Sequence, residues 1–134
     1  MDRLLQLKRH FGEICERIGA DWPLRTAPMH DGSPHIEVSE NSYSYVVTER
    51  GLELERRTTE SEEEVLYWLT ASMVFSVAVR YELCHRQPGR DCRRVLFAHE
   101  LELMDRINPV WRQRKAVEIG QILEQHPYRD EIEA

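Results

Sequence analysis

The stretch from residue 35 to residue 58 constrains the fold most, because apolar and polar residues alternate along it with a period of two. In YSYVVTERGLELERRTT, residues 43–59, tyrosine, valine and leucine alternate with polar and charged side chains around one glycine. A period of two is typical of a strand with one buried and one exposed face. The pattern predicts three antiparallel strands and two tight turns: residues 35–39, 42–49 and 52–58, with Glu40-Asn41 and Arg50-Gly51 between them.

Pairing across these two turns predicts a register and two faces. Four opposed pairs follow: Val38–Tyr43, Ile36–Tyr45, Val47–Leu54 and Glu49–Leu52. One face is predicted to be core: Ile36, Val38, Tyr43, Tyr45, Val47, Leu52 and Leu54. The other is predicted to face solvent: His35, Glu37, Val46, Thr48, Glu53, Glu55 and Arg57. A slip of one residue in the second hairpin would exchange the faces of one strand and place two leucines in water.

Four helices are predicted around this meander from apolar residues spaced by three and four: residues 2–18, 60–86, 92–107 and 109–125. Gly19 supplies a left-handed stop for the first helix, and Trp22 is expected to hold the following loop against the core. The other helices have start signals: the capping box Thr59-Glu60-Ser61-Glu62, then Asp91, then Asn108-Pro109.

The predicted fold class is α+β, with an N-terminal helix, a three-stranded antiparallel β-meander, and then three α-helices packed on the sheet. Because no linker is long enough to divide the chain, residues 1–134 are predicted to form a single domain. Its parts are a helix and loop, the meander and a helical part: residues 1–30, 34–58 and 60–126. The C-terminal YRDEIEA is predicted to fray.

The second helix is predicted to be central, because residues 65–79 are apolar almost all round. Arg80 follows this run and is expected to pair with Glu100 or Glu102 of the next helix. The third helix is predicted to bury one stripe: Val95, Leu96, His99, Leu103 and Ile107. The fourth is predicted to bury some combination of Trp111, Val117, Ile119, Ile122 and Leu123.

Composition and charge narrow the classes of function. The formal charge is −6, from 24 acidic against 18 basic residues, which argues against nucleic acid as a partner and suits a basic protein. The N-terminus lacks the apolar core of a signal peptide, and the longest apolar run is too short and polar for a membrane span. A cytoplasmic protein is therefore expected. Three cysteines without an export signal predict reduced thiols.

A search for catalytic or ligand-binding motifs predicts no catalytic residue, cofactor or metal. Cysteines and histidines gather near the loop between the second and third helices, but not at a known ligand spacing: Cys84, His85, Cys92 and His99. Whether these four meet in space is left open. The glycines Gly32, Gly51 and Gly89 are isolated, so no phosphate-cradling loop is expected.

Four segments together carry a resemblance to a known family: PHIEV, YSYVVTERGLELERRTT, LYWLT…VFSVAVRYELCHR and RRVLFAHELELMDRINPVW. In this order and spacing the chain resembles the immunity protein 63 family of bacterial polymorphic toxin systems, from about Pro34 to Pro127. The resemblance implies a small, non-catalytic cytoplasmic protein without a cofactor. It would bind and neutralise a cognate toxin domain by direct protein–protein association.

The resemblance implies neither the toxin nor the surface that binds it. We hypothesise that acidic residues of the meander and of the second helix meet a basic toxin surface, such as a nuclease-like cleft: Glu37, Glu53, Glu55, Glu60, Glu62 and Glu63. The alternative is that these acids only solvate the sheet and cap the helix. A stand-alone adaptor or regulator, or a small-substrate enzyme, are the other functions left open, as is the oligomeric state.

Overall fold

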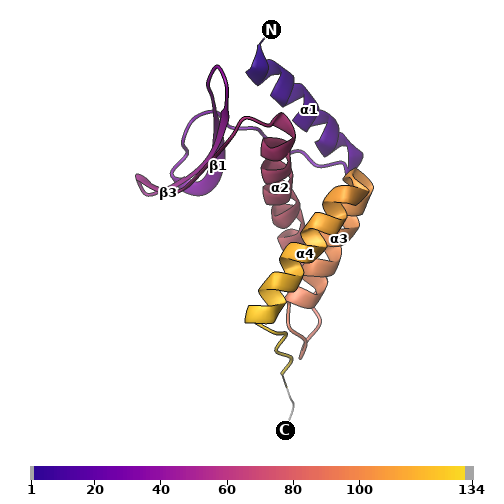
Figure 1. Ribbon diagram of the computed structural model, residues 1–134. Helices are drawn as coiled ribbons and strands as arrows, with labels where there is room; N and C mark the ends of the chain where they lie inside the picture. Colours follow the sequence, from indigo (N-terminus) through magenta and orange to yellow (C-terminus); the bar gives the residue numbers. More distant parts are fainter. Residues whose placement is uncertain (1, 132–134) are drawn as a thin grey trace. The chain divides into compact units, whose positions relative to one another are not determined.

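The computed structural model describes residues 2–131, and its fold class is α+β as predicted (Figure 1). One helix precedes a three-stranded sheet, and three helices follow. The elements are α1 (Arg3–Arg17), β1 (Asp31–Val38), β2 (Tyr43–Glu49), β3 (Leu52–Thr59), α2 (Glu62–Cys84), α3 (Arg93–Ile107) and α4 (Pro109–Gln125).

The chain divides into two compact units, and the boundary falls within α2. The first unit, Met1–Ser72, holds α1, the sheet and the first half of α2. The second, Met73–Ala134, holds the rest of α2, α3 and α4. That the whole chain is one domain stays a prediction.

Local capping signals explain most helix ends. Asp2 accepts hydrogen bonds from the backbone of Leu4 and Leu5 at the start of α1, and Gly19 follows the helix with a φ of 65°. Asn108 accepts from Val110 N at the start of α4, where the proline expected at the first position stands. The predicted stop at Gly19 and the predicted start at Asn108-Pro109 are confirmed, whereas the Asp2 cap was not predicted.

The start of α2 differs from the predicted capping box. Ser61 Oγ accepts from Glu64 N (3.1 Å), so the cap lies two residues beyond Thr59. The side chain of Thr59 instead accepts from Ser61 N (3.0 Å), because the backbone there still belongs to the end of β3. At the start of α3, Asp91 Oδ1 does accept from Arg93 N (3.0 Å).

The sheet is antiparallel in the order β1-β2-β3, and most of the predicted register is confirmed. Arg50 and Gly51 have φ values of 52° and 81°. Two positive φ values in a two-residue turn suit the twist of a hairpin. The confirmed pairs are Val38–Tyr43, Ile36–Tyr45 and Glu49–Leu52.

The fourth predicted pair is wrong, because β3 contains a β-bulge. Thr48 opposes Glu53, but Val47 opposes Glu55, so Leu54 is an extra residue on β3. An extra residue reverses the alternation of side chains beyond it. The bulge is therefore a local form of the one-residue slip, and it reassigns the faces of β3.

Burial of the sheet also departs from the predicted two faces. The core positions Ile36, Tyr43 and Tyr45 are buried as predicted, and Val38 and Val47 are half-buried. Three residues expected to face solvent are buried instead, which means that the middle of β1 and β2 is covered on both faces: His35, Val46 and Thr48. The two leucines expected in the core are exposed, Leu52 by 66% and Leu54 by 58%.

The rest of the core of the first unit comes from α1 and α2. Phe11 packs edge-on against Trp22, with ring centroids 6.0 Å apart, and this contact holds the loop after α1 as expected. Both helices bury apolar side chains: Leu7, Phe11, Ile14 and Cys15 from α1, and Val65, Leu66, Tyr67 and Leu69 from α2.

In the second unit α3 and α4 lie side by side (Figure 1). Leu103 and Ile107 are buried as predicted, but Val95, Leu96 and His99 are only half-buried. The stripe is rotated, so that Phe97, Glu100 and Met104 are buried instead. On α4 the buried residues are Trp111 and Ile119, whereas Val117 and Ile122 are exposed.

Buried Glu100 faces Lys115 of α4, with Nζ 3.5 Å from Oε2, rather than Arg80 as expected. Burial raises the pKa of the Glu100 carboxyl above its usual value, and the nearby Lys115 partly opposes this. Arg80 is exposed on α2. The predicted Arg80 pairing is therefore wrong, since Lys115 of α4 is the cation that faces Glu100.

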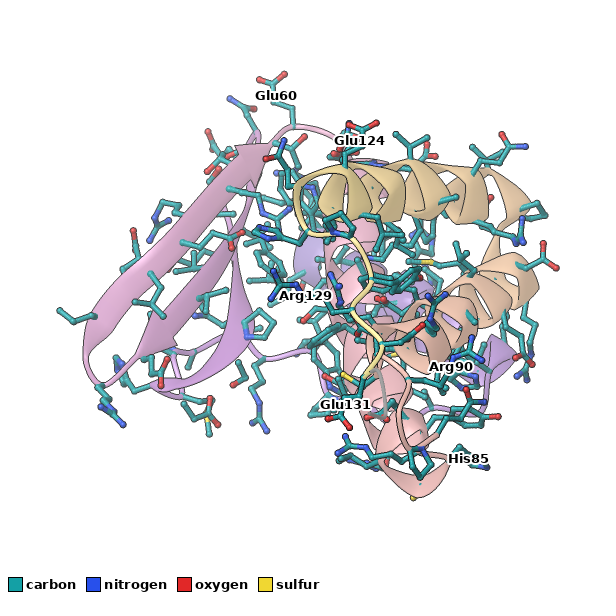
Figure 2. The ribbon with its side chains drawn as sticks, turned by 90° about the horizontal axis from the view of Figure 1, so that it is seen from below. Glu60, His85, Arg90, Glu124, Arg129 and Glu131 are labelled. Atoms are coloured by element: carbon teal, nitrogen blue, oxygen red, sulfur yellow. The ribbon has the colours of Figure 1, made fainter. Side chains whose placement is uncertain are left out.

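The C-terminal segment 126–131 is held against the start of α3, so the predicted fraying is wrong for its described part. Arg93 donates to the carbonyl oxygens of His126 and Pro127 (both 2.8 Å). Arg94 makes two 2.9 Å hydrogen bonds to Asp130, and its guanidinium lies 4.2 Å from the Tyr128 ring centroid. Figure 2 labels Arg90, Arg129 and Glu131 in this region. Residues 132–134 of the tail lie outside the described residues.

Candidate functional site

Strand β3 is the most exposed regular element of the sheet. It is an edge strand, and every residue from Leu52 to Thr58 is exposed. Large apolar side chains in water on an edge strand are uncommon unless they serve an interface, and charges and bulges protect such edges from unwanted pairing. We therefore examine β3 and the acidic residues around it as the candidate partner-binding surface.

A charged network covers one face of the sheet beside this strand. Arg56 donates to Glu53 (Nη2–Oε1, 2.8 Å) and to Glu37 (Nη1–Oε1, 2.9 Å). His35 Nε2 lies 3.0 Å from Glu37 Oε2. The network therefore runs from β1 to β3 through four side chains and holds Arg56 between two carboxylates.

The electrostatics of this network favour its charged form. Hydrogen bonds from Arg56, and for Glu37 also from His35, lower the pKa of both carboxyls. The same bonds to Glu53 and Glu37 raise the pKa of the Arg56 guanidinium. Two carboxylates around one guanidinium leave one net negative charge, which is more modest than a bare acidic patch.

Glu55 lies in a different environment, because the bulge places it with Arg57 on the other face of β3. Arg57 Nε lies 2.5 Å from Glu55 Oε2. Its guanidinium lies 4.7 Å from the ring centroid of Tyr45 and 4.8 Å from that of Trp68. This arginine stacks between a strand and α2, so its main contribution is structural.

The other predicted site residues gather at the start of α2. Glu62 contacts His10 of α1, an interaction that the sequence did not indicate. Glu60 and Glu63 are exposed. Acidic side chains are also stabilising at the positive N-terminal end of a helix, so this local effect alone can account for the three glutamates.

The structure thus divides the six acids predicted to bind a partner. Glu37 and Glu53 come together through Arg56, Glu55 lies on the other face, and the remaining three form the start of α2. Arg56, Leu52 and Leu54 were missed as surface features. Only the adjacent pair Arg56-Arg57 could have hinted that one arginine faces each side of the strand.

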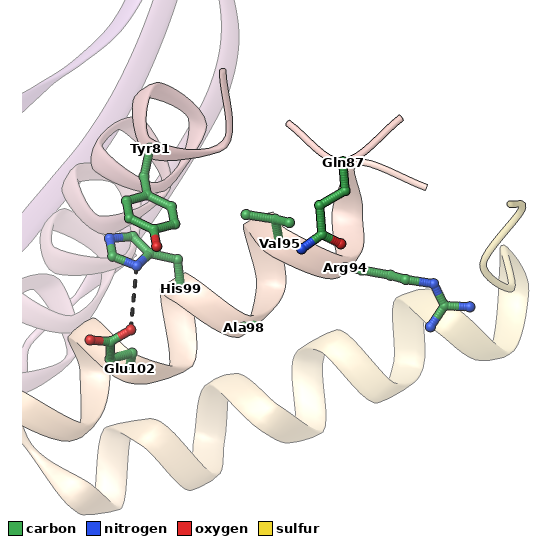
Figure 3. A pocket seen from close by; sticks show the side chains of 7 residues that line it. All are labelled: Tyr81, Gln87, Arg94, Val95, Ala98, His99 and Glu102. Atoms are coloured by element: carbon green, nitrogen blue, oxygen red, sulfur yellow. Dashed lines mark ion pairs between the residues drawn. The ribbon is translucent and has the colours of Figure 1, made fainter. Parts of the chain in front are cut away.

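A second polar cluster lies where α2 ends and α3 begins. The Tyr81 ring is stacked between two imidazoles, with centroids 3.9 Å from His85 and 3.8 Å from His99. Figure 3 shows Tyr81 against His99 and the 3.5 Å ion pair from His99 to Glu102. Tyr81, His99 and Glu102 border a hollow of about 240 Å³.

This arrangement does not place metal ligands together. His85 and His99 are separated by the Tyr81 ring, and Cys84 and Cys92 are exposed free thiols. Over residues 2–131, no group of three or more His, Cys, Asp or Glu side chains could hold a metal ion. The stacked rings join α2 to α3 and are explained by packing.

Two further observations concern the chain as a whole. Within the same described residues, no helix is long and apolar enough to cross a lipid bilayer. No curated protein and no solved structure matches the chain.

One family model does match. The model of the family described as Immunity protein 63 matches residues 40–121, which is more than half of the chain. The matched region contains β2, β3, α2 and α3 whole, together with most of α4. It includes the bulged strand and three of the four segments on which the resemblance was noted, and PHIEV, residues 34–38, lies before it. The chain therefore belongs to the immunity protein 63 family.

Proposed function

We propose that this protein binds the toxin domain of a bacterial polymorphic toxin system and neutralises it by direct association, without catalysis or a cofactor. The observation that carries the proposal is the family match over residues 40–121. The proposal places the complex in the cytoplasm of the producing cell, where the toxin would otherwise act. A basic toxin surface, such as that of a nuclease, is the partner that the charge of this chain favours.

The exposed sheet edge supports association as the mechanism. Interfaces combine apolar anchors and arginines with a polar rim. Leu52 and Leu54 offer apolar area in water, and Arg56 is already held by two carboxylates. A side chain that is ordered before binding loses less conformational entropy when a partner docks. The surface is therefore suited to a protein partner.

The acidic residues give the proposed contact surface a net negative charge. Glu37 and Glu53 outnumber Arg56 on one face, and Glu60 and Glu63 add exposed carboxylates at the start of α2. A net charge of −6 would attract a basic toxin and speed encounter. Four of the six predicted acids, Glu37, Glu53, Glu60 and Glu63, therefore remain part of the proposed contact surface.

Charge reversal tests this surface. The double variant Glu37→Lys and Glu53→Lys is compared with Glu124→Lys, an exposed acid of α4. Each is co-expressed with the toxin domain encoded beside this protein, and growth and co-purification are scored. We expect the double variant to lose binding and the control to keep it. Unchanged binding by the double variant would exclude this face. Equal toxicity with and without the wild-type protein would exclude neutralisation.

A further inference from the structure

The second half of α2 has one face that the rest of the second unit does not cover. Met73, Val74, Ala78 and Glu82 are buried on one side of the helix. On the other side Phe75 and Leu83 are 49% and 62% exposed. A helix that is apolar all round is expected to have neighbours on every side. One neighbour of this half of α2 is therefore missing from the second unit.

The exposed residues form a continuous surface, which we call the α2 open face: Phe75, Ser76, Val79, Arg80 and Leu83. They follow one another at helical spacings of three and four, so they share one side of α2. Together they line an open hollow of about 320 Å³. Exposed contiguous apolar area of this kind marks protein interaction sites.

Arg80 is the one charged residue of the α2 open face. Other arginines of the second unit face carboxylates: Arg86 with Glu82, Arg93 with Asp91, and Arg94 with Asp130. For Arg80, by contrast, no carboxylate lies within ion-pair distance among residues 2–131. A guanidinium in the middle of an apolar surface gains most when a partner supplies a carboxylate.

This charge pattern decides between two occupants of the face. A second copy packed by twofold symmetry would bring the same surface against itself. Two Arg80 side chains would then lie near the axis, and the nearest acid of the helix, Glu82, is buried and bonded to Arg86. Like charges without a counter-ion oppose such a dimer. A different protein with its own carboxylate fits the face instead.

We propose that the α2 open face is a further contact surface for the toxin domain, which fills the hollow with apolar side chains and sets a carboxylate against Arg80. The inference rests on the proposed function, because it assigns a surface and a chemistry to the same partner. Phe75 and Arg80 are the anchors, since aromatic residues and arginine dominate the binding energy of most interfaces. The toxin thus presents one acidic residue within an apolar patch.

Two variants and two matched controls test the surface. Arg80→Glu places a negative charge against the carboxylate expected from the toxin domain, and Leu83→Ser removes apolar area from the α2 open face. Arg112→Glu and Val117→Ser make the same changes at exposed positions of α4. Thermal unfolding and circular dichroism confirm that all four fold. Affinity for the purified toxin domain is measured by isothermal titration calorimetry.

We expect Kd to rise about tenfold or more for Arg80→Glu and for Leu83→Ser, and to stay within about twofold for both controls. Hydrogen exchange of residues 73–84 should slow when the toxin binds. Wild-type affinity in Arg80→Glu and Leu83→Ser would overturn this inference and leave the proposed function standing. Absence of binding by the wild type would overturn both. A wild-type dimer that Leu83→Ser dissociates would identify a second copy as the occupant and overturn the inference.

Discussion

The Glu100–Lys115 pair between α3 and α4 gives the sharpest stability prediction. The side chains are 2% and 15% exposed, and Nζ lies 3.5 Å from Oε2. At an effective dielectric constant of about 20, unit charges at this distance attract by about 5 kcal/mol. Desolvation cancels much of that, but removing one partner leaves a buried charge and costs about 3–5 kcal/mol. We therefore predict that Lys115→Met destabilises the protein by about 3 kcal/mol at about pH 7.

The loss should depend on pH, because Glu100 can escape its buried charge by binding a proton. Its folded-state pKa is already raised, and without Lys115 it rises further. The folded state then binds more protons than the unfolded state, so stability falls as pH rises through this window. Protonation relieves at most about 1.4 kcal/mol per pH unit, so we expect the loss to fall below about 1 kcal/mol at about pH 5.

Urea unfolding at both pH values measures these losses. Arg112→Met is the matched control on α4 and should change stability by less than about 0.5 kcal/mol. The double variant Glu100→Gln and Lys115→Met should recover most of the lost stability, because no buried charge remains. An equal loss of stability at both pH values, or a loss below about 0.5 kcal/mol at about pH 7, would refute this account of the pair.

Three other predictions follow from single contacts. Arg57→Ala removes the guanidinium between Tyr45 and Trp68 and should lower the free energy of unfolding in urea by about 1 kcal/mol. The control Arg50→Ala should leave it nearly unchanged, and an equal effect of both variants would contradict the stacking role of Arg57. Gly51→Val should lower the midpoint of thermal unfolding, because a β-branched residue is strained at a φ of 81°. An unchanged midpoint would contradict the claim that this turn needs a glycine. Hydrogen bonds from Arg93 lower the pKa of the Asp91 carboxyl. The stability that the ionised carboxylate contributes is therefore present above the ordinary pKa of 3.8 and is lost as the pH falls below 3.8. The protection factors of the backbone amides in the 126–131 segment, which correct for the intrinsic pH dependence of exchange, should therefore fall in acid, but not in Asp91→Asn, where they should already be low.

Features that depend on neighbouring residues could be predicted from the sequence. The first hairpin, the Arg50-Gly51 turn, the Gly19 stop and the Asn108 cap are local, and each was found in the structure. Helix ends are encoded by a few side chains that bond to the backbone within one turn. Such signals depend little on tertiary context, although the cap predicted at Thr59 lies at Ser61 because β3 continues to Thr59.

The bulge at Leu54 could not be predicted, because strict alternation is the simplest interpretation of an LELE pattern. A bulge is favoured or disfavoured by what covers each face beyond it. Here Arg57 stacks between Tyr45 and Trp68 of α2, whereas Arg56 reaches Glu37 on β1. The reversed faces of β3 therefore go together with contacts to residues that are distant in the sequence, which the pattern of the strand alone does not indicate.

The same limit applies to the C-terminal segment and to the charged surface. YRDE has no apolar period, but its Asp130 accepts hydrogen bonds from Arg94, 36 residues away in sequence, and the carbonyl of the preceding His126 accepts one from Arg93, 33 residues away. For the surface, the sequence indicated the acids but not their partners. Arg56 neutralises part of the charge that was expected to be bare.

Co-expression of this protein with the toxin domain encoded beside it tests the central claim most directly. We predict that cells carrying both genes grow like cells without the toxin, and that the two proteins co-purify at a fixed ratio. Rescue should disappear with the Glu37→Lys and Glu53→Lys double variant and persist with Glu124→Lys. Growth arrest that is the same with and without the wild-type protein would contradict the claim.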